Sequence, residues 1–230
     1  MDSAITIEQV AATIAHEVKN PISLVLANIA LLELDDLSEA NQKSCSVMKR
    51  ELNKVMNIML DFIQLAKPAQ NNLEELDLNT MLFDIMDNCK DVSREKISYL
   101  FNCNTGNIKV NADKAKLSRV FFNIYKNSME AISEKGTIAT YVSKDENWVK
   151  IKIVDDGSGI SDRLKEKITT PFFTTKESGS GLGLFISKNI VQEHSGSFDL
   201  ESEENKGCCI TIVLPLHNGD SLKEQDFEAM

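Results

Sequence analysis

The sequence predicts two domains of different fold class: an all-α helical hairpin that forms a dimeric four-helix bundle, and an α/β sandwich after it. Three observations predict this. Residues 5–66 carry two apolar stripes at helical spacing, a segment with a proline follows, and the rest of the chain alternates β-branched segments with helical ones. We expect the hairpin at 1–67, the sandwich at 68–218 and a polar tail at 219–230.

The hairpin is predicted from two stripes of apolar side chains. Residues 7–32 place them at steps of three or four, which draws one stripe along a long helix. After a turn at 34–38, residues 45–66 keep the strict 3-4 rhythm of coiled-coil packing. A lone hairpin cannot cover both stripes, whereas two copies form a four-helix bundle with a shared interior. The sequence therefore predicts a homodimer held by residues 5–66.

The sandwich is predicted from the segments after the linker Lys67-Pro-Ala-Gln-Asn-Asn, which has no periodicity. The predicted strands are rich in β-branched residues and lie at Ile108–Val110, Thr137–Val142, Val149–Val154 and Cys209–Leu214. The predicted helices between them lie at Asn79–Val92, Lys114–Ser133 and Leu182–His194. This alternation is typical of a mixed α/β sandwich.

The composition argues against several partners and locations. The 230 residues include 25 Lys and Arg against 35 Asp and Glu, a formal net charge of −10, whereas nucleic-acid binding needs clustered basic side chains. The apolar stretch 22–34 is too short and too often interrupted to span a membrane, and the N-terminus lacks a signal-peptide pattern, so we expect a cytoplasmic protein. The five cysteines show no C-x-x-C spacing, which indicates reduced thiols and no transition-metal site.

His16 stands out on the first predicted helix. It lies almost opposite the apolar stripe, so we expect it to face solvent. Glu17 follows it, Asn20 lies one turn on, and Pro21 interrupts the helix at a cost of about 3 kcal/mol, which implies a compensating function. An exposed imidazole beside a carboxylate can act as a nucleophile with a proton acceptor. A lone histidine is more often a surface or satisfied core residue, which is our interpretation of His194 and His217.

A polar cluster on the predicted helix 114–133 could serve a metal–phosphate group. Asn123 and Asn127 share one face at positions i and i+4, with Lys126 beside them. Two amide oxygens and a cation suit such a group, although a polar helix face is the alternative interpretation.

A second cluster follows the predicted strand that ends at Val154. A carboxylate at a strand end, Asp155, can accept an adenine amino proton, and Gly157 and Gly159 let a flat ring approach the backbone. A plain turn is the alternative interpretation here.

Two further clusters come later in the chain. In Pro171-Phe172-Phe173-Thr-Thr-Lys176, two phenylalanines before a loop are more often core than function. Gly179, Gly181 and Gly183, before Leu184, open a helix whose N-terminal amides can face phosphate oxygens. Each cluster is weak alone. Their order behind a His-Glu-x-x-Asn-Pro helix leaves little room for chance.

Over residues 5–216 the sequence resembles the sensor histidine kinases of two-component signalling. The segment His16-Glu-Val-Lys-Asn-Pro is similar to the H box of that family. The four later clusters are similar to its N box (Asn123–Ala131), G1 box (Asp155–Ile160), F box (Pro171–Lys176) and G2 box (Gly179–Leu184). The resemblance implies a dimerisation and phosphoacceptor hairpin, followed by a Bergerat-type ATP-binding domain shared with gyrase, Hsp90 and MutL ATPases.

The resemblance also implies roles for single residues. ATP would phosphorylate His16, with Glu17 as its acid/base partner, and Asn20 would position water for dephosphorylation of a response regulator. Asn127 would hold Mg²⁺ and Asp155 would bind adenine. The other residues at the nucleotide would be Asn123, Lys126, Gly157, Gly159, Phe172, Lys176, Gly179, Gly181, Gly183 and Leu184. The implied activity is a histidine autokinase that passes its phosphoryl group to a receiver-domain aspartate, with phosphatase activity in reverse.

The sequence departs from the family pattern at a few positions, and two other functions remain as alternatives. The hydrolysing relatives have a Glu where this chain has Asn123, and an amide cannot activate water, which favours transfer over hydrolysis. Thr170 stands where many members have Glu, and Ser195 replaces the first glycine of a common His-Gly-Gly. The alternatives are a signalling phosphatase or phosphotransfer adaptor, and an ATP-driven conformational machine. The stimulus and the cognate receiver are not encoded in the sequence.

Overall fold

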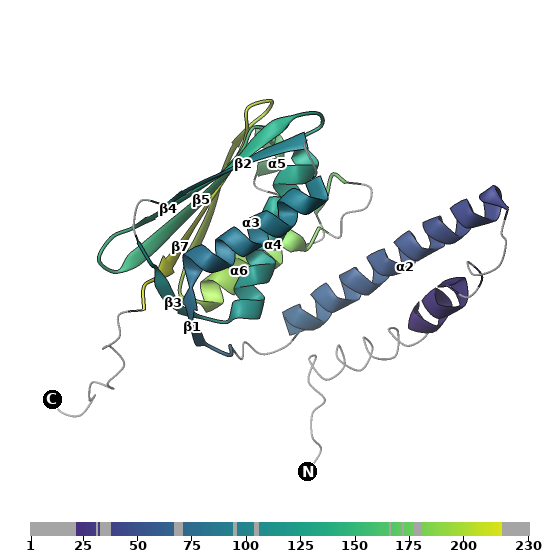
Figure 1. Ribbon diagram of the computed structural model, residues 1–230, viewed down its shortest axis with the longest axis horizontal. Helices are drawn as coiled ribbons and strands as arrows, with labels where there is room; N and C mark the ends of the chain where they lie inside the picture. Colours follow the sequence, from purple (N-terminus) through teal and green to yellow (C-terminus); the bar gives the residue numbers. More distant parts are fainter. Residues whose placement is uncertain are drawn as a thin grey trace, which may run out of the picture. The chain divides into compact units, whose positions relative to one another are not determined.

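The computed structural model describes residues 22–30, 32, 38–66, 71–93, 96–103, 106–165, 167–171, 173–176 and 181–217. Contacts divide the chain into two compact units (Figure 1). The first comprises residues 1–70 with 167–186, and the second comprises residues 71–166 with 187–230. The predicted domain bounds stay a prediction, because residues 67–70 and 218–230 lie outside the described residues.

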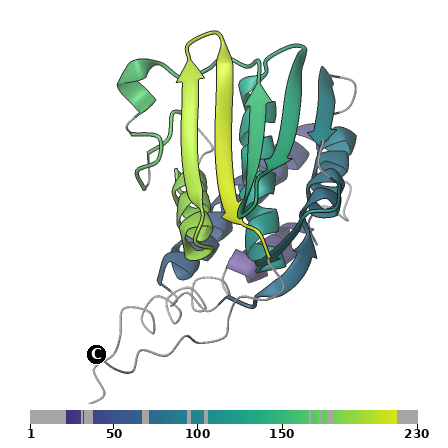
Figure 2. The ribbon, with the colours of Figure 1, turned by 90° about the vertical axis from the view of Figure 1, so that its left-hand side faces the viewer.

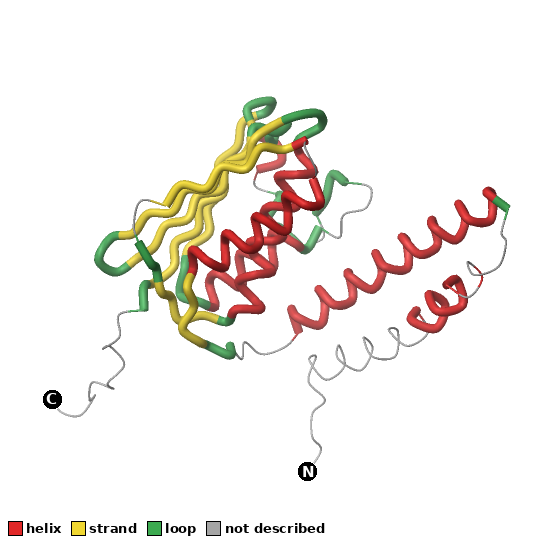
Figure 3. Tube along the Cα trace, viewed as in Figure 1, coloured by secondary structure: helices red, strands yellow, loops and turns green. Residues whose placement is uncertain are grey.

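The first unit contains the described parts of the two predicted hairpin helices, drawn in red in Figure 3, and the predicted helical residues before Ile22 lie outside the described residues. Residues 22–30 are helical, and helix α2 spans Glu39–Ala66. The carbonyl of Ser38 accepts the N–H groups of Asn41 and Gln42 at 2.9 and 3.0 Å, so α2 begins there. Of the stripe residues whose side chains the structure describes, Ile22, Ile29 and Cys45 are buried within the single chain. Several large apolar side chains of the two helices are exposed: Leu24, Val25, Leu32, Val47, Met48 and Val55.

The second unit is built on a five-stranded sheet of order β2-β4-β5-β7-β6. Its strands are β2 (Ile97–Cys103), β4 (Gly136–Lys144), β5 (Trp148–Asp155), β6 (Ser197–Glu203) and β7 (Gly207–Pro215). Strands β2 and β4 pair in parallel, and the other neighbours are antiparallel. A separate two-stranded sheet pairs β1 (Glu74–Asp77) with β3 (Lys109–Ala112).

Helices cover one face of this sheet, and the other face carries none of the helices that the structure describes, as Figure 2 shows. They are α3 (Leu78–Ser93), α4 (Lys114–Ala131) and residues 187–193 of α6 (Gly183–Glu193); α5 (Asp162–Lys165) is a single turn after β5. Alternate residues of the central strands point into the core, because side chains of a strand alternate between its faces. These buried residues include Val149, Ile151, Ile153, Ile210, Ile212 and Leu214. The predicted α/β sandwich is therefore confirmed.

Every strand and helix predicted in this unit is present, with shifts of at most two residues at the ends. The predicted helix 114–133 ends earlier, at Ala131, because Ile132 has extended backbone angles. The prediction missed β1, β2, β6 and the short α5.

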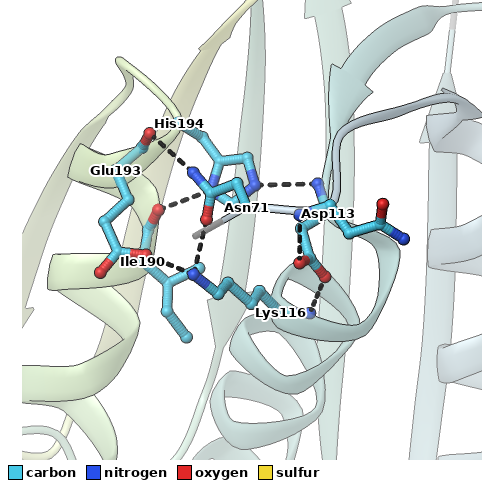
Figure 4. Close-up of polar contacts among 7 residues, drawn as sticks. Asn71, Asp113, Lys116, Ile190, Glu193 and His194 are labelled. Atoms are coloured by element: carbon cyan, nitrogen blue, oxygen red, sulfur yellow. Dashed lines mark hydrogen bonds and ion pairs between the residues drawn. The ribbon is translucent and has the colours of Figure 1, made fainter. Parts of the chain in front are cut away.

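His194 links the end of α6 to the start of α4, as Figure 4 shows. Its Nε2 accepts the backbone N–H of Asp113 at 3.0 Å, and its Nδ1–H donates to the carbonyl of Ile190 at 2.7 Å. These two partners fix the neutral tautomer that carries the proton on Nδ1. Of the two interpretations that the sequence left for His194, surface or satisfied core residue, the structure shows the second.

The beginning of the second unit is tied to the same place (Figure 4). The carboxylate of Asp113 caps α4 through the N–H of Lys116 at 3.0 Å and also accepts the N–H of Asn72 at 3.1 Å. The ammonium of Lys116 donates to Asn71 Oδ1 at 2.6 Å and to Glu193 Oε2 at 2.9 Å. The chain therefore enters the sandwich along the facing ends of α4 and α6.

Candidate functional site

Asp155 is a buried carboxyl at the end of β5, where the alternation of that strand turns it inward. Its Oδ2 accepts the hydroxyl of Ser128 at 2.8 Å, and its Oδ1 accepts the N–H of Gly157 at 3.1 Å. Burial raises the pKa of Asp155, and hydrogen bonds from Ser128, Gly157 and the Cys208 backbone partly offset the rise. The carboxyl thus has a fixed orientation in a low-dielectric site.

The turn after Asp155 requires glycine at two positions. A Cβ on Gly157 would lie 2.8 Å from that of Ala131 and 2.9 Å from Asp155 Oδ1. Gly159 has a φ of +64°, and a Cβ there would collide with the carbonyl of Glu203. The turn therefore fits closely between the end of α4 and the β6–β7 connection.

Helix α4 carries the second predicted cluster. Its buried side faces the sheet and includes Leu117, Val120, Phe121, Ile124, Tyr125 and Ser128. Asn123 and Asn127 are half-buried beside this side, and Asn123 Nδ2 donates to the buried hydroxyl of Ser187 on α6 at 3.1 Å. Lys126 is exposed and lies 4.0 Å from Glu130. Asn123 and Asn127 therefore share one face of α4, as their i, i+4 spacing predicts, whereas Lys126 extends into solvent.

An open pocket of about 300 Å³ touches Asp155 from β6 and β7. Its charged lining consists of the carboxylates Asp155, Glu201 and Glu203 with a single lysine, Lys206. Such a lining repels phosphate groups. We therefore expect a nucleotide to reach Asp155 from the side of α4.

The residues of the F and G2 clusters belong to the first unit and are described by themselves. The N–H of Lys176 donates to Thr174 Oγ1 at 3.1 Å, and Thr170 Oγ1 donates to the Lys167 carbonyl at 2.6 Å. Gly181 has a φ of +69°, Leu182 is fully buried, and α6 begins at Gly183, followed by Leu184. Phe172 and Gly179 lie outside the described residues, as do His16, Glu17 and Asn20.

The sequence reasoning missed three residues of the site. Ser128 bonds Asp155 directly, and Ser202 Oγ accepts the N–H of Ile160 at 2.9 Å and donates to the Gly207 carbonyl at 2.7 Å. Cys208 lies next to Asp155, and burial raises the pKa of its thiol to about 12. The only available signal was the place of Ser128 directly after Asn127 in the polar cluster.

Two family models match this chain. The His Kinase A (phospho-acceptor) domain matches residues 6–71, and the histidine kinase-, DNA gyrase B- and HSP90-like ATPase matches residues 112–218. The nucleotide-free catalytic domain of histidine kinase ThkA is 32% identical, with a TM-score of 0.58, over 63% of this chain and 95% of that one. The chain belongs to the sensor histidine kinases of two-component systems. The predicted family is confirmed.

Longer relatives of this histidine kinase are similar over almost its whole length. Sensor histidine kinase ZraS of Escherichia coli (strain K12) is 32% identical over 94% of the chain and 47% of the relative. Sporulation kinase A of Bacillus subtilis (strain 168) is 31% identical over 90% of the chain and 34% of the relative. The histidine kinase therefore spans about half the length, or less, of these curated relatives.

Solved structures show the same two-part architecture. Full-length ShkA in complex with AMPPNP shares the fold with a TM-score of 0.79 at 22% identity, over 92% of this histidine kinase and 46% of ShkA. ThkA in complex with the response regulator protein TrrA is 26% identical, with a TM-score of 0.67, over 90% of this chain and 61% of that one. In the described part of the histidine kinase, no helix is long and apolar enough to cross a membrane.

Proposed function

We propose that this histidine kinase phosphorylates its own His16 from ATP and passes the phosphoryl group to an aspartate of a response regulator receiver domain. The observation that carries the proposal is the buried carboxyl of Asp155, held in place by Ser128 and Gly157. The match of residues 6–71 to a phosphoacceptor domain supports a group in this chain that receives the phosphoryl group. ThkA, a relative in this fold, has been crystallised with a response regulator.

Asp155 supports adenine recognition because it is a hydrogen-bond acceptor in a buried position. The hydrogen bonds that it already receives stabilise its ionised form. The 6-amino group of adenine is a donor, so it matches the remaining lone pairs of the carboxylate. The glycine turn after Asp155 brings backbone, with no side chain at two positions, next to that carboxyl.

Asn127 is the residue that we propose for Mg²⁺. Among the residues that the structure describes, no three His, Cys, Asp or Glu side chains come together as a metal site. An amide oxygen on α4 fits a hard cation that takes most of its ligands from phosphates and water. Bound Mg²⁺ would spread the charge of the triphosphate.

The transfer step uses the imidazole of His16. An imidazole with the ordinary pKa of about 6.5 is mostly neutral near pH 7. A nitrogen–phosphorus bond forms while the bond from the γ-phosphorus to the bridging oxygen of ADP breaks, and Glu17 takes the ring proton. Hydrolysis is disfavoured because the Asn123 amide, which donates to Ser187, cannot act as a base toward water.

We infer a homodimer from the apolar side chains that the two hairpin helices leave exposed. Among the described residues, six large ones are at least two-fifths exposed in the single chain: Leu24, Val25, Leu32, Val47, Met48 and Val55. A second copy would remove them from water and gain about 25 cal/mol per Å² buried. A cytoplasmic location stays a prediction, in keeping with five free cysteines.

Incubation of the full chain with γ-labelled ATP and Mg²⁺ tests the kinase. We expect acid-labile, base-stable label that His16→Ala abolishes and that the matched control His217→Ala retains. Label that survives His16→Ala would overturn the assignment. Sustained phosphate release at equal rates in His16→Ala and the wild type would instead support an ATP-driven machine.

Phosphatase activity is the second part of the proposal. Asn20 follows His16 by four positions in the sequence and has an amide that can orient water. We expect the full chain with ADP to speed the loss of phosphate from a phosphorylated receiver, and Asn20→Ala to slow it. An unchanged decay in Asn20→Ala would show that the residue has no such role.

A further inference from the structure

We propose that Ser128 is a positioning residue for adenine recognition. Its hydroxyl holds the carboxylate of Asp155 in the orientation that accepts the 6-amino group, and so contributes to the choice of ATP over nucleotides that lack this group. The inference rests on the proposed role of Asp155 in binding adenine.

The contact between Ser128 and Asp155 is buried and joins two separate elements. The side chains are 4% and 5% exposed, and the hydroxyl on α4 lies 2.8 Å from Oδ2 at the end of β5. A serine inside a helix usually bonds a carbonyl of the preceding turn or faces solvent. Here the hydroxyl donates to a carboxyl 27 residues away in the sequence.

The two oxygens of Asp155 are held from different sides. Oδ1 accepts the N–H of Gly157 in the turn, and Oδ2 accepts Ser128 on the helix. The terminal torsion of an aspartate is broad, so a single hydrogen bond leaves the plane of the carboxyl poorly defined. Together the two bonds fix that plane.

This arrangement leaves a defined acceptor for one more donor. An ionised carboxyl offers about four lone-pair sites, and Ser128 and Gly157 occupy one on each oxygen. The backbone of Cys208 pairs with that of Asp155 in the neighbouring strand. The remaining capacity suits an amino group, whereas the 6-oxo group of guanine is itself an acceptor and would be repelled.

Loss of the Ser128 hydroxyl would leave Oδ2 without its protein partner in a buried site. A buried charged oxygen without a partner is costly, so the carboxyl would rotate or recruit water. Either change weakens only contacts that depend on the carboxyl. Binding of the ribose and phosphates would not change, because these parts of the nucleotide do not contact Asp155 in the proposed complex.

The test measures binding of two nucleotides to the full chain by calorimetry: ATP and purine riboside 5′-triphosphate, which lacks the 6-amino group. We expect Ser128→Ala to weaken ATP binding about tenfold and to change binding of the analogue less than about twofold. Ser128→Cys keeps the size of the side chain but is a weak donor, so it should show the same selective loss even if the alanine variant folds poorly. Ser118→Ala, at a half-buried serine on the same helix, is the matched control and should leave both affinities unchanged.

Two further outcomes separate this inference from the function on which it rests. In the Asp155→Asn background, Ser128→Ala should have little additional effect on ATP binding, because the two residues act together. An equal loss for both nucleotides in Ser128→Ala and Ser128→Cys would mean a purely structural role and would overturn the inference. If the unmutated chain binds both nucleotides equally, the role of Asp155 itself is wrong.

Discussion

The imidazole of His194 accepts a hydrogen bond from the backbone N–H of Asp113, a residue 81 positions earlier in the chain. This hydrogen bond joins the end of α6 to the residue that caps α4. The other ring nitrogen of His194, Nδ1, bonds the carbonyl of Ile190. Both polar groups of the ring are therefore satisfied inside the protein. Neither backbone partner has water as a ready substitute at this buried position.

His194→Ala should lower the free energy of unfolding by about 3 kcal/mol. The substitution leaves the Asp113 N–H and the Ile190 carbonyl without their partner, and it also opens a cavity. Urea unfolding followed by the fluorescence of Trp148, the single tryptophan, measures the change. His217→Ala at the exposed end of the unit is the control and should cost less than about 0.5 kcal/mol.

Acid should weaken the cap of α4. Burial raises the pKa of Asp113, but the hydrogen bonds from the N–H groups of Lys116 and Asn72 lower it, and the net shift of the pKa is downward. A carboxyl with a lowered pKa stabilises the folded state above its unfolded pKa of about 3.9, and this contribution is lost as pH falls through the lower folded pKa. We expect the stability difference between the wild type and Asp113→Asn to shrink over that range in urea titrations.

Ser195→Gly should stabilise the protein by about 0.5–1 kcal/mol. Ser195 ends α6 with a φ of 56°, a left-handed conformation that glycine adopts without steric cost. Thermal unfolding of the full chain would show the gain. Ser197→Gly, two residues on at an exposed position of β6, should have the opposite sign, because glycine weakens a strand.

Gly159→Ala should weaken ATP binding at least about tenfold. An alanine Cβ would collide with the carbonyl of Glu203, and a φ of +64° is strained for alanine, so the turn beside Asp155 must move. Calorimetry with ATP measures the loss. Gly106→Ala is the matched control, since a Cβ there meets nothing within 4 Å, and binding equal to that of Gly106→Ala would contradict the prediction.

Val55→Glu should dissociate the proposed homodimer and reduce autophosphorylation without affecting nucleotide binding. Val55 is 43% exposed in the single chain, so a charge there costs the monomer little but would be buried against a second copy. Light scattering at micromolar concentration reports the mass. Asn53→Glu, about 200° away around α2, is the control and should stay dimeric. A monomeric wild type would contradict the architecture.

Much of the fold was predictable because its signals are local. The β-branched alternation of Val149–Val154 indicates a strand, and it also places Asp155 at the strand end where the carboxyl is buried. The positions of Asn123 and Asn127 on one helix face likewise depend only on helical spacing. Both features follow from a few neighbouring residues.

The missed features depend on distant parts of the chain. Strand β6 is an edge strand whose outward residues are Asp199, Glu201 and Glu203, so its sequence has too few apolar residues to indicate a strand. The role of Ser128 depends on how α4 is rotated against β5, and the partner of His194 is 81 residues away. No local pattern encodes such a pairing.

The place of β7 in the sheet has a consequence for synthesis on the ribosome. This strand is the last of those that the structure describes, yet it lies between β5 and β6, and its Cys208 pairs with Asp155 in the ladder. A nascent chain that ends before Gly207 therefore lacks the strand that joins β6 to β5, which carries Asp155 at its end. Because domains fold largely in the order of their synthesis, the phosphoacceptor hairpin is complete long before the nucleotide site. Incomplete or prematurely terminated chains would thus carry a histidine that they cannot phosphorylate themselves.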